Sequence, residues 1–174
     1  MKQSQNYISN RVLKINVGFL LSDGPAHSQD SVIDFPKVRV SDDLTLEYVR
    51  GPLRLSRTSE GILVQADLEA AVEAECYRCL EATDNVFQVH LEELFATDGS
   101  VQTDFRVHDD GILDLAPLLR DEALLAIDNR VLCRPDCKGL CPECGSNLNI
   151  VPCQCELESV DPRLAALKNL LDTQ

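Results

Sequence analysis

Cysteine is the residue type in this sequence whose spacing most directly suggests chemistry. The chain of 174 residues has eight cysteines, and six of them fall between residues 133 and 155. They form four close pairs: Cys76 with Cys79, Cys133 with Cys137, Cys141 with Cys144, and Cys153 with Cys155. Tetrahedral zinc takes four thiolates, usually as two short-spaced pairs that wrap the ion from two sides. Four pairs are therefore enough for one or two zinc sites.

The most specific element is the sequence CPECG at residues 141–145. Proline after the first cysteine and glycine after the second suit the tight turn of a zinc knuckle. The eight residues that follow Cys144 are enough to return the chain to the same ion. The spacing thus predicts one zinc site made by the last four cysteines, which are Cys141, Cys144, Cys153 and Cys155.

The pair Cys133 and Cys137 then needs a partner, because only three residues separate Cys137 from the next cysteine. The remaining candidates are Cys76 and Cys79, so a second site would join the tail to the body. The alternative is a single zinc ion held by four of the six tail cysteines, with Cys76 and Cys79 as reduced thiols. The spacing alone leaves both arrangements open.

Other kinds of cysteine chemistry fit the sequence less well. Disulfides are typical of exported proteins, and the N-terminus has neither the apolar run nor the cleavage site of a signal peptide. The longest apolar stretches are also far too short to span a membrane, so we expect a cytoplasmic protein. The sequence CYRC at residues 76–79 lies among glutamates that would raise a thiol pKa, unlike a redox CxxC. The spacing matches neither common ferredoxin pattern.

The elements that would position the cysteines are mainly strands. In residues 62–76 apolar and polar residues alternate, which predicts a long strand with one solvated face. The alternation resumes at residues 87–92, so the two segments should pair as an antiparallel hairpin with Cys76 and Cys79 at or near its turn. Residues 11–21 also read as a strand, and residues 96–111 as a loop.

Two helices are expected in the second half of the chain. Asp114 can cap a helix through residues 115–128, with Pro117 in its first turn. Asp161 and Pro162 can begin a short amphipathic helix near the C-terminus. The predicted fold is α+β, a mostly antiparallel β-sheet with one or two helices and a small C-terminal zinc-knuckle segment.

Charge is distributed unevenly along the chain. The net charge is −13, and residues 58–128 contain three basic and seventeen acidic residues. Such an acidic segment repels the phosphates of nucleic acid, so RNA would contact the more basic ends. The acidic residues form either a solvated surface or a docking surface for a basic partner.

The sequence offers little for catalysis. It contains none of the GxSxG, GxxxxGK[ST], GxGxxG or HExxH motifs. The three histidines, which are His27, His90 and His108, have no paired nucleophile nearby in the sequence. We therefore expect a protein that is not an enzyme and takes no small-molecule substrate.

Five segments together resemble the YceD family, the large ribosomal RNA subunit accumulation proteins. They read, in order, GILVQADLEAAVEAECYRCLE, LEELF, ILDLAPLLRDEALLAI, CRPDCKGLCPECGSNLN and DPRLAALKNLL. The resemblance implies a non-enzymatic ribosome biogenesis factor needed for accumulation of large-subunit (23S) ribosomal RNA. Its partner would be a large-subunit precursor, through either a basic ribosomal protein or rRNA, with no membrane involved. The zinc sites are inferred from spacing and do not follow from the resemblance.

The resemblance and the charge distribution together suggest a division of the chain. Residues 1–130 would form a YceD-like α+β body with an acidic middle at residues 58–128. Residues 131–174 would form a cysteine-rich, zinc-binding tail that ends in a short helix. The alternative function is a zinc- or redox-responsive regulatory binding module, in which the cysteines report metal or oxidation.

Overall fold

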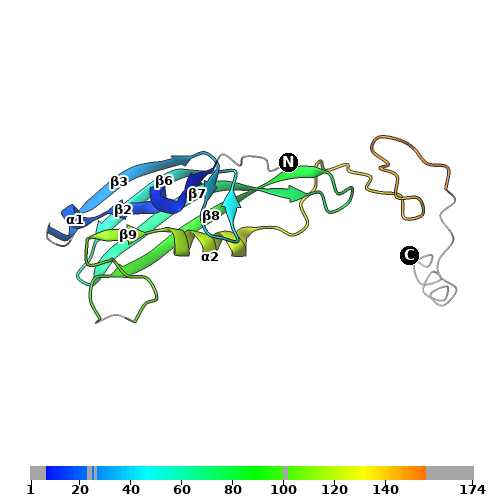
Figure 1. The fold of residues 1–174 in the computed structure, drawn as a ribbon. Coiled ribbons are helices and arrows are strands. Elements are labelled where there is room, and N and C mark those ends of the chain that lie inside the picture. The colour runs from blue at the N-terminus through cyan, green and yellow to red at the C-terminus, as the bar shows by residue number, and fades with distance from the viewer. Residues whose placement is uncertain (1–6, 23–24, 26, 100–101, 156–174) are drawn as a thin grey trace.

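A four-stranded antiparallel sheet is the centre of the protein (Figure 1). The computed structural model describes residues 7–22, 25, 27–99 and 102–155. The strands of this sheet are β3 (Ser28–Phe35), β6 (Tyr48–Arg57), β7 (Gly61–Glu75) and β8 (Ala82–Ala96), in that spatial order. Each pairs antiparallel with its neighbour, so the predicted fold class is confirmed.

The predicted hairpin is present, and it is longer than the alternation suggested. Strands β7 and β8 pair over fifteen residues each, from Gly61 opposite Ala96 to Glu75 opposite Ala82. Alternate residues of both strands are buried, including Leu68 on β7 and Leu91 on β8. The turn at residues 76–81 carries Cys76 and Cys79 and lies at the far end of the molecule from α1 (Gly18–Ser22) (Figure 1).

The prediction of one strand over residues 11–21 is only partly right. The segment contains a 3-10 helix (Asn10–Leu13), the short strand β2 (Lys14–Asn16), and then α1. The side chain of Asn16 accepts a hydrogen bond from the backbone N–H of Gly18, 2.9 Å away, which turns the chain out of the strand. The buried residues Leu13, Val17 and Leu20 are three or four positions apart, a helical spacing that apolar composition concealed.

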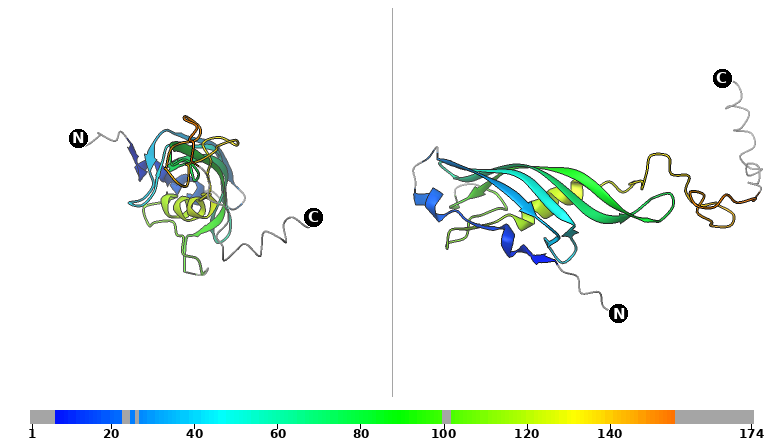
Figure 2. Two further views of the ribbon diagram at one scale, coloured as in Figure 1. Left: turned by 90° about the vertical axis from the view of Figure 1, so that its right-hand side faces the viewer. Right: turned by 90° about the horizontal axis from the view of Figure 1, so that it is seen from above.

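The other short strands form two small sheets. Strand β2 pairs antiparallel with β9 (Ile112–Asp114). Strands β1 (Ile8–Ser9), β4 (Val38–Arg39) and β5 (Thr45–Leu46) form the second sheet, in which β1 lies parallel to β4. These pieces surround the main core and lie away from the cysteine tail (Figures 1 and 2).

Helix α2 (Ala116–Ala126) closes the core by packing against β8. The Asp114 carboxylate accepts a hydrogen bond from the backbone N–H of Ala116 at 3.0 Å, close to the capping role predicted for it. Leu118, Leu119 and Ala123 are buried on the sheet side. Among the described residues no helix has the length and apolar character needed to cross a membrane. The helix predicted to begin at Asp161 lies outside the described residues.

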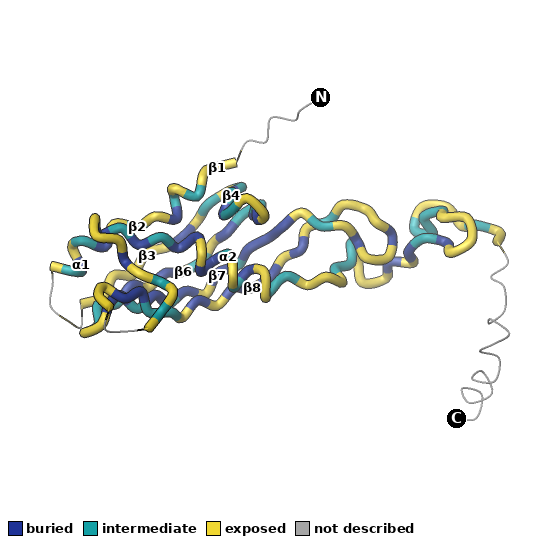
Figure 3. Tube along the Cα trace, turned by 60° about the horizontal axis from the view of Figure 1, so that its bottom comes forward, coloured by how far each residue is buried: buried dark blue, intermediate teal, exposed yellow. Residues whose placement is uncertain are grey.

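Beyond α2, the chain runs along the hairpin to a cysteine-rich segment at the end of the molecule (Figures 1 and 3). Two separate apolar clusters result. The large one lies within the body, and a small one consists of Cys76, Cys79 and Cys137 with partly buried Leu132, Cys133 and Leu140 against them. The division of the chain at residue 130 stays a prediction.

One buried polar side chain ties the exit from α2 to the hairpin. Asn85 on β8 is 4% exposed, and its Nδ2 donates a hydrogen bond to the backbone carbonyl of Asp128 at 2.7 Å. This contact sets where the chain leaves the body toward the cysteines.

We expect Asn85→Ala to lower the free energy of unfolding by about 1 kcal/mol, because the substitution removes this hydrogen bond from a buried site. Urea denaturation measures the change. Val86→Thr is the matched control, since Val86 lies on the exposed face of the same strand. Equal losses in the two variants would contradict a specific role for Asn85.

Candidate metal centre

The structure brings the eight cysteines together in two groups of four. In each group the four Sγ atoms all lie within 4.8 Å of one another. The inner group, on the hairpin turn, is Cys76, Cys79, Cys133 and Cys137, and the outer group is Cys141, Cys144, Cys153 and Cys155. The six tail cysteines are thus divided between two groups, and either group could hold a metal ion. Metal binding by these residues stays a prediction.

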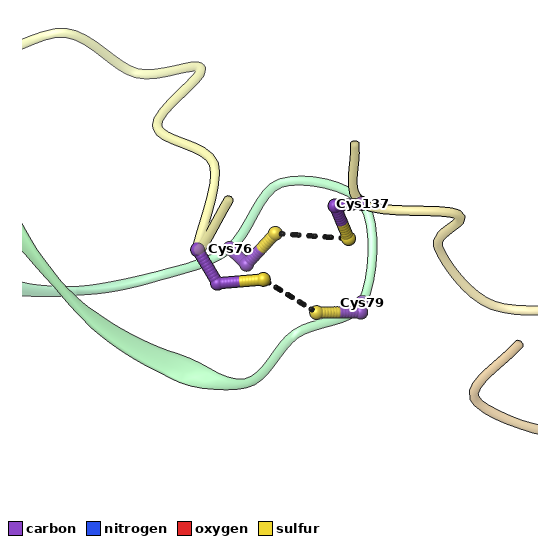
Figure 4. A group of neighbouring side chains, drawn as sticks. Cys76, Cys79 and Cys137 are labelled. Atoms are coloured by element: carbon purple, nitrogen blue, oxygen red, sulfur yellow. Dashed lines mark hydrogen bonds between the residues drawn. The ribbon is translucent and has the colours of Figure 1, made fainter. Parts of the chain in front are cut away.

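The inner group has the dimensions of a tetrahedral thiolate site. The Sγ atoms of Cys76 and Cys137 are 3.8 Å apart, and those of Cys79 and Cys133 are 3.6 Å apart (Figure 4). A tetrahedral ion with metal–sulfur bonds of about 2.3 Å places its sulfurs about 3.8 Å apart. All eight cysteines are free thiols, so the spacing is that of four separate ligands.

The β7–β8 turn positions one half of the inner group. The backbone N–H of Cys76 donates to the carbonyl of Glu81, and the N–H of Leu80 donates to the carbonyl of Cys76, both at 2.8 Å. Leu80 has a φ of 60°, an unusual conformation for a residue with a side chain. The turn therefore directs the Cys76 and Cys79 thiols toward the tail.

The tail is bound to the turn by backbone contacts on either side of the thiols. The N–H of Tyr77 donates to the carbonyl of Val131 at 2.9 Å, and the guanidinium of Arg78 donates to the carbonyl of Cys137 at 2.9 Å. The backbone at Gly139 passes close to the carbonyl of Arg78. A Cβ at this position would lie 3.0 Å from that oxygen, and its φ of +77° also favours glycine.

The outer group is built on a tight hairpin that follows the inner group directly. The N–H of Cys141 donates to the carbonyl of Ser146, and the N–H of Gly145 donates to the carbonyl of Cys141, both at 2.9 Å. Gly145 has a φ of +71°, the conformation for which the glycine after a knuckle is suited. Cys141 is 3% exposed, whereas Cys144 is exposed to solvent.

The thiols of each group differ in acidity. In the inner group, backbone N–H donors, first that of Cys133, lower the pKa of Cys76 to about 6, while burial raises the pKa of Cys133 to about 12. In the outer group, the Ser146 hydroxyl lowers the pKa of Cys144 to about 6, and the neighbouring Cys144 raises the pKa of Cys155 to about 12. Each group accommodates a first thiolate readily and further thiolates at increasing cost, which a divalent cation would offset.

Two residues that the sequence analysis missed contact the inner group. Asn149 donates from Nδ2 to the Cys137 Sγ at 3.3 Å, and its Oδ1 accepts from the backbone N–H of Lys138 at 2.8 Å. Arg78 bonds the Cys137 carbonyl, as described above. Neither residue type is a zinc ligand, so nothing in the spacing of the cysteines marks them.

The fold and the site define a small α+β protein whose longest hairpin carries half of a four-cysteine group at its turn. Residues 64–171 match the family model described as Large ribosomal RNA subunit accumulation protein YceD. The chain belongs to this family, which confirms the resemblance seen in its segments.

Named relatives agree with the family assignment. An uncharacterized protein of Mycobacterium bovis is 40% identical over 126 residues, which are 68% of this chain and 60% of that protein. The uncharacterized protein YlbN of Bacillus subtilis is 28% identical over 75% of this chain and 78% of its own length. Large ribosomal RNA subunit accumulation protein YCED homolog 1, chloroplastic, of Arabidopsis thaliana is 38% identical over 33% of this chain and 18% of its own.

The chain spans about 60% of the length of the mycobacterial relatives it matches. No solved structure matches the chain.

We expect Cys144 to be the first cysteine alkylated by iodoacetamide in the reduced, metal-free protein at pH 7. It is exposed, and its lowered pKa makes it mostly thiolate at that pH, whereas the similarly acidic Cys76 is buried. Ser146→Ala should slow the reaction several-fold, because it removes the hydroxyl that stabilises the thiolate. Peptide mass spectrometry over time gives the order. Modification of Cys155 before Cys144 would show that the acidities are misassigned.

Proposed function

We propose that this protein is a non-enzymatic cytoplasmic factor needed for accumulation of large-subunit (23S) ribosomal RNA. It acts as an adaptor in ribosome biogenesis and binds a basic ribosomal protein of a large-subunit precursor. Membership of the YceD family supports the process. The adaptor role rests on one observation, which is the acidic outer face of the β7–β8 hairpin.

The outer face of the hairpin is the face opposite the core, and it is strongly acidic. Its acidic residues lie at the exposed positions of the alternation on the two strands. They are Asp67, Glu69, Glu73, Glu75, Asp84 and Glu92. All of them fall within the residues that match the family model.

The acidic residues differ in how far cations of the protein neutralise them. Asp67 pairs with His90 at 2.6 Å and Glu69 with Arg50 at 2.5 Å. At the turn end, Glu73 lies directly opposite Asp84, and like charges in this arrangement destabilise a sheet. Among the described residues no ion pair joins Glu73, Glu75 or Asp84 to a cation.

This unneutralised end favours a basic protein over RNA as the direct partner. Carboxylates repel the phosphate backbone of RNA, whereas they attract lysine and arginine side chains and steer their approach. The carboxylates lie next to the turn that carries the inner group, so a partner on the acidic end would also meet the tail (Figure 1).

Zinc is the ion that we propose for both cysteine groups, one ion in each. The sulfur separations and the all-thiolate ligand sets support it, because structural zinc sites with four cysteines have these features. The ions would hold the tail beside the acidic end and would take no part in chemistry.

A regulatory role is the second candidate, and the exposure of Cys144 favours it. A solvent-accessible thiolate could respond to oxidation or to the supply of zinc. This candidate predicts that binding of the partner changes when the outer group is oxidised or emptied, whereas a purely structural tail would bind equally well once folded.

We expect the double substitution Glu75→Lys with Asp84→Lys to reduce co-sedimentation with large-subunit precursors several-fold at low salt. The wild-type association should itself weaken as salt rises, because exposed charges are screened. Precursor fractions from a sucrose gradient and the level of 23S rRNA in a complemented deletion strain are the readouts.

The double substitution Asp104→Lys with Asp109→Lys is the matched control, since it changes the net charge equally on exposed residues of the loop between β8 and β9. If both double variants lose association to the same degree, net charge alone is responsible. If neither loses it, the acidic end is not the docking surface.

A further inference from the structure

The outer group reaches the rest of the molecule mainly through the turn that the inner group holds. The backbone N–H of Leu140 donates to the carbonyl of Arg78 at 3.0 Å, and Asn147 donates from Nδ2 to the Glu81 carboxylate at 2.9 Å. Both acceptors lie in the β7–β8 turn, between or just beyond the inner cysteines of that turn. The position of the outer hairpin thus depends on the tail being fixed to this turn.

A shared segment and one side chain connect the two groups directly. Only three residues separate Cys137 of the inner group from Cys141 of the outer group, and one of them, Leu140, packs against the inner cluster. Asn149 lies in the return segment that leads to Cys153, and it bonds both the Cys137 sulfur and the Lys138 N–H. Placing Cys137 therefore helps to place the start and the return of the outer hairpin.

The two groups differ in access from solvent. The exposed fractions of Cys76, Cys79 and Cys137 are 0%, 4% and 2%. In the outer group Cys144 is exposed. Removal of a metal by a chelator requires the incoming ligand to reach the ion or a dissociated thiolate, so an ion in the outer group would exchange faster.

We infer that the two groups fill in a fixed order and serve different purposes. The inner group is a slowly exchanging structural site for a divalent thiophilic ion, here Zn²⁺. The outer group is an exchangeable site that forms with high affinity only after the inner group has been filled. This inference rests on the proposed zinc binding, and it goes beyond the adaptor function, because it makes the outer hairpin responsive to available zinc.

The order can be tested with the full chain and zinc alone as the probe. Native mass spectrometry should find two zinc ions per wild-type chain and one per Cys144→Ser chain. On addition of excess EDTA with a colorimetric zinc indicator, the wild type should release zinc in a fast and a slow phase. Only the slow phase should remain in Cys144→Ser, whereas Cys76→Ser should lose the slow phase and bind its outer ion at least tenfold more weakly.

A Cys76→Ser chain that keeps one zinc ion with wild-type affinity would overturn the inference, because the outer group would then form alone. A wild-type chain that binds no zinc would also overturn it. The adaptor proposal would survive either result, since its test is the charge-reversed hairpin and its association with ribosomal precursors.

Asn149→Ala provides a second test that keeps all eight thiols and does not depend on folding of Cys76→Ser. It should speed the fast phase several-fold, because the outer return segment loses its connection to Cys137. Gln154→Ala is the control, since this exposed side chain lies between two outer cysteines and has no hydrogen bond among the described contacts. Equal release rates in Asn149→Ala and Gln154→Ala would refute the coupling of the two groups.

Discussion

The convergence of four thiols at the β7–β8 turn is the constraint on which the C-terminal part of the structure depends. The body has its own core between the main sheet and α2, and the tail contributes nothing to it. The tail is held instead by a cluster of three buried cysteines and a few partly buried neighbours, with backbone hydrogen bonds on either side. So small an apolar cluster stabilises little by burial alone. Metal coordination would supply the missing free energy, since structural zinc contributes directly to folding.

The same turn brings charge and metal ligands to one end of the molecule. The paired strands carry unneutralised carboxylates up to the turn, and the cysteine groups follow immediately. Four thiolates around one divalent ion keep a net negative charge, so loading with metal would leave this end anionic. A basic protein surface matches such an end better than a nucleic-acid backbone does.

The success of the predicted elements followed the strength of their periodicity. Alternation over fifteen residues identified β7, because a long run of period two has few alternative explanations. The segment at residues 11–21 failed, because a short apolar run fits a strand and a helix equally well. Its structure was decided by Asn16, whose side chain bonds the backbone of Gly18, and by burial of Leu13, Val17 and Leu20 against the body. Such contacts depend on distant parts of the chain.

For the cysteines, the sequence determined the pairs, and the tertiary structure decided which pairs meet. Spacing of two to four positions forces each pair onto one turn, so Cys76 with Cys79 or Cys141 with Cys144 could be recognised locally. The sequence left open one group or two, since it does not state where residues 133–137 return in space. The fifteen-residue strands carry the CxxC turn out beyond the core, and the exit from α2 brings Cys133 and Cys137 to it. Asn149 and Arg78 became part of the site only through that meeting, because their contacts join segments that are brought together by the fold.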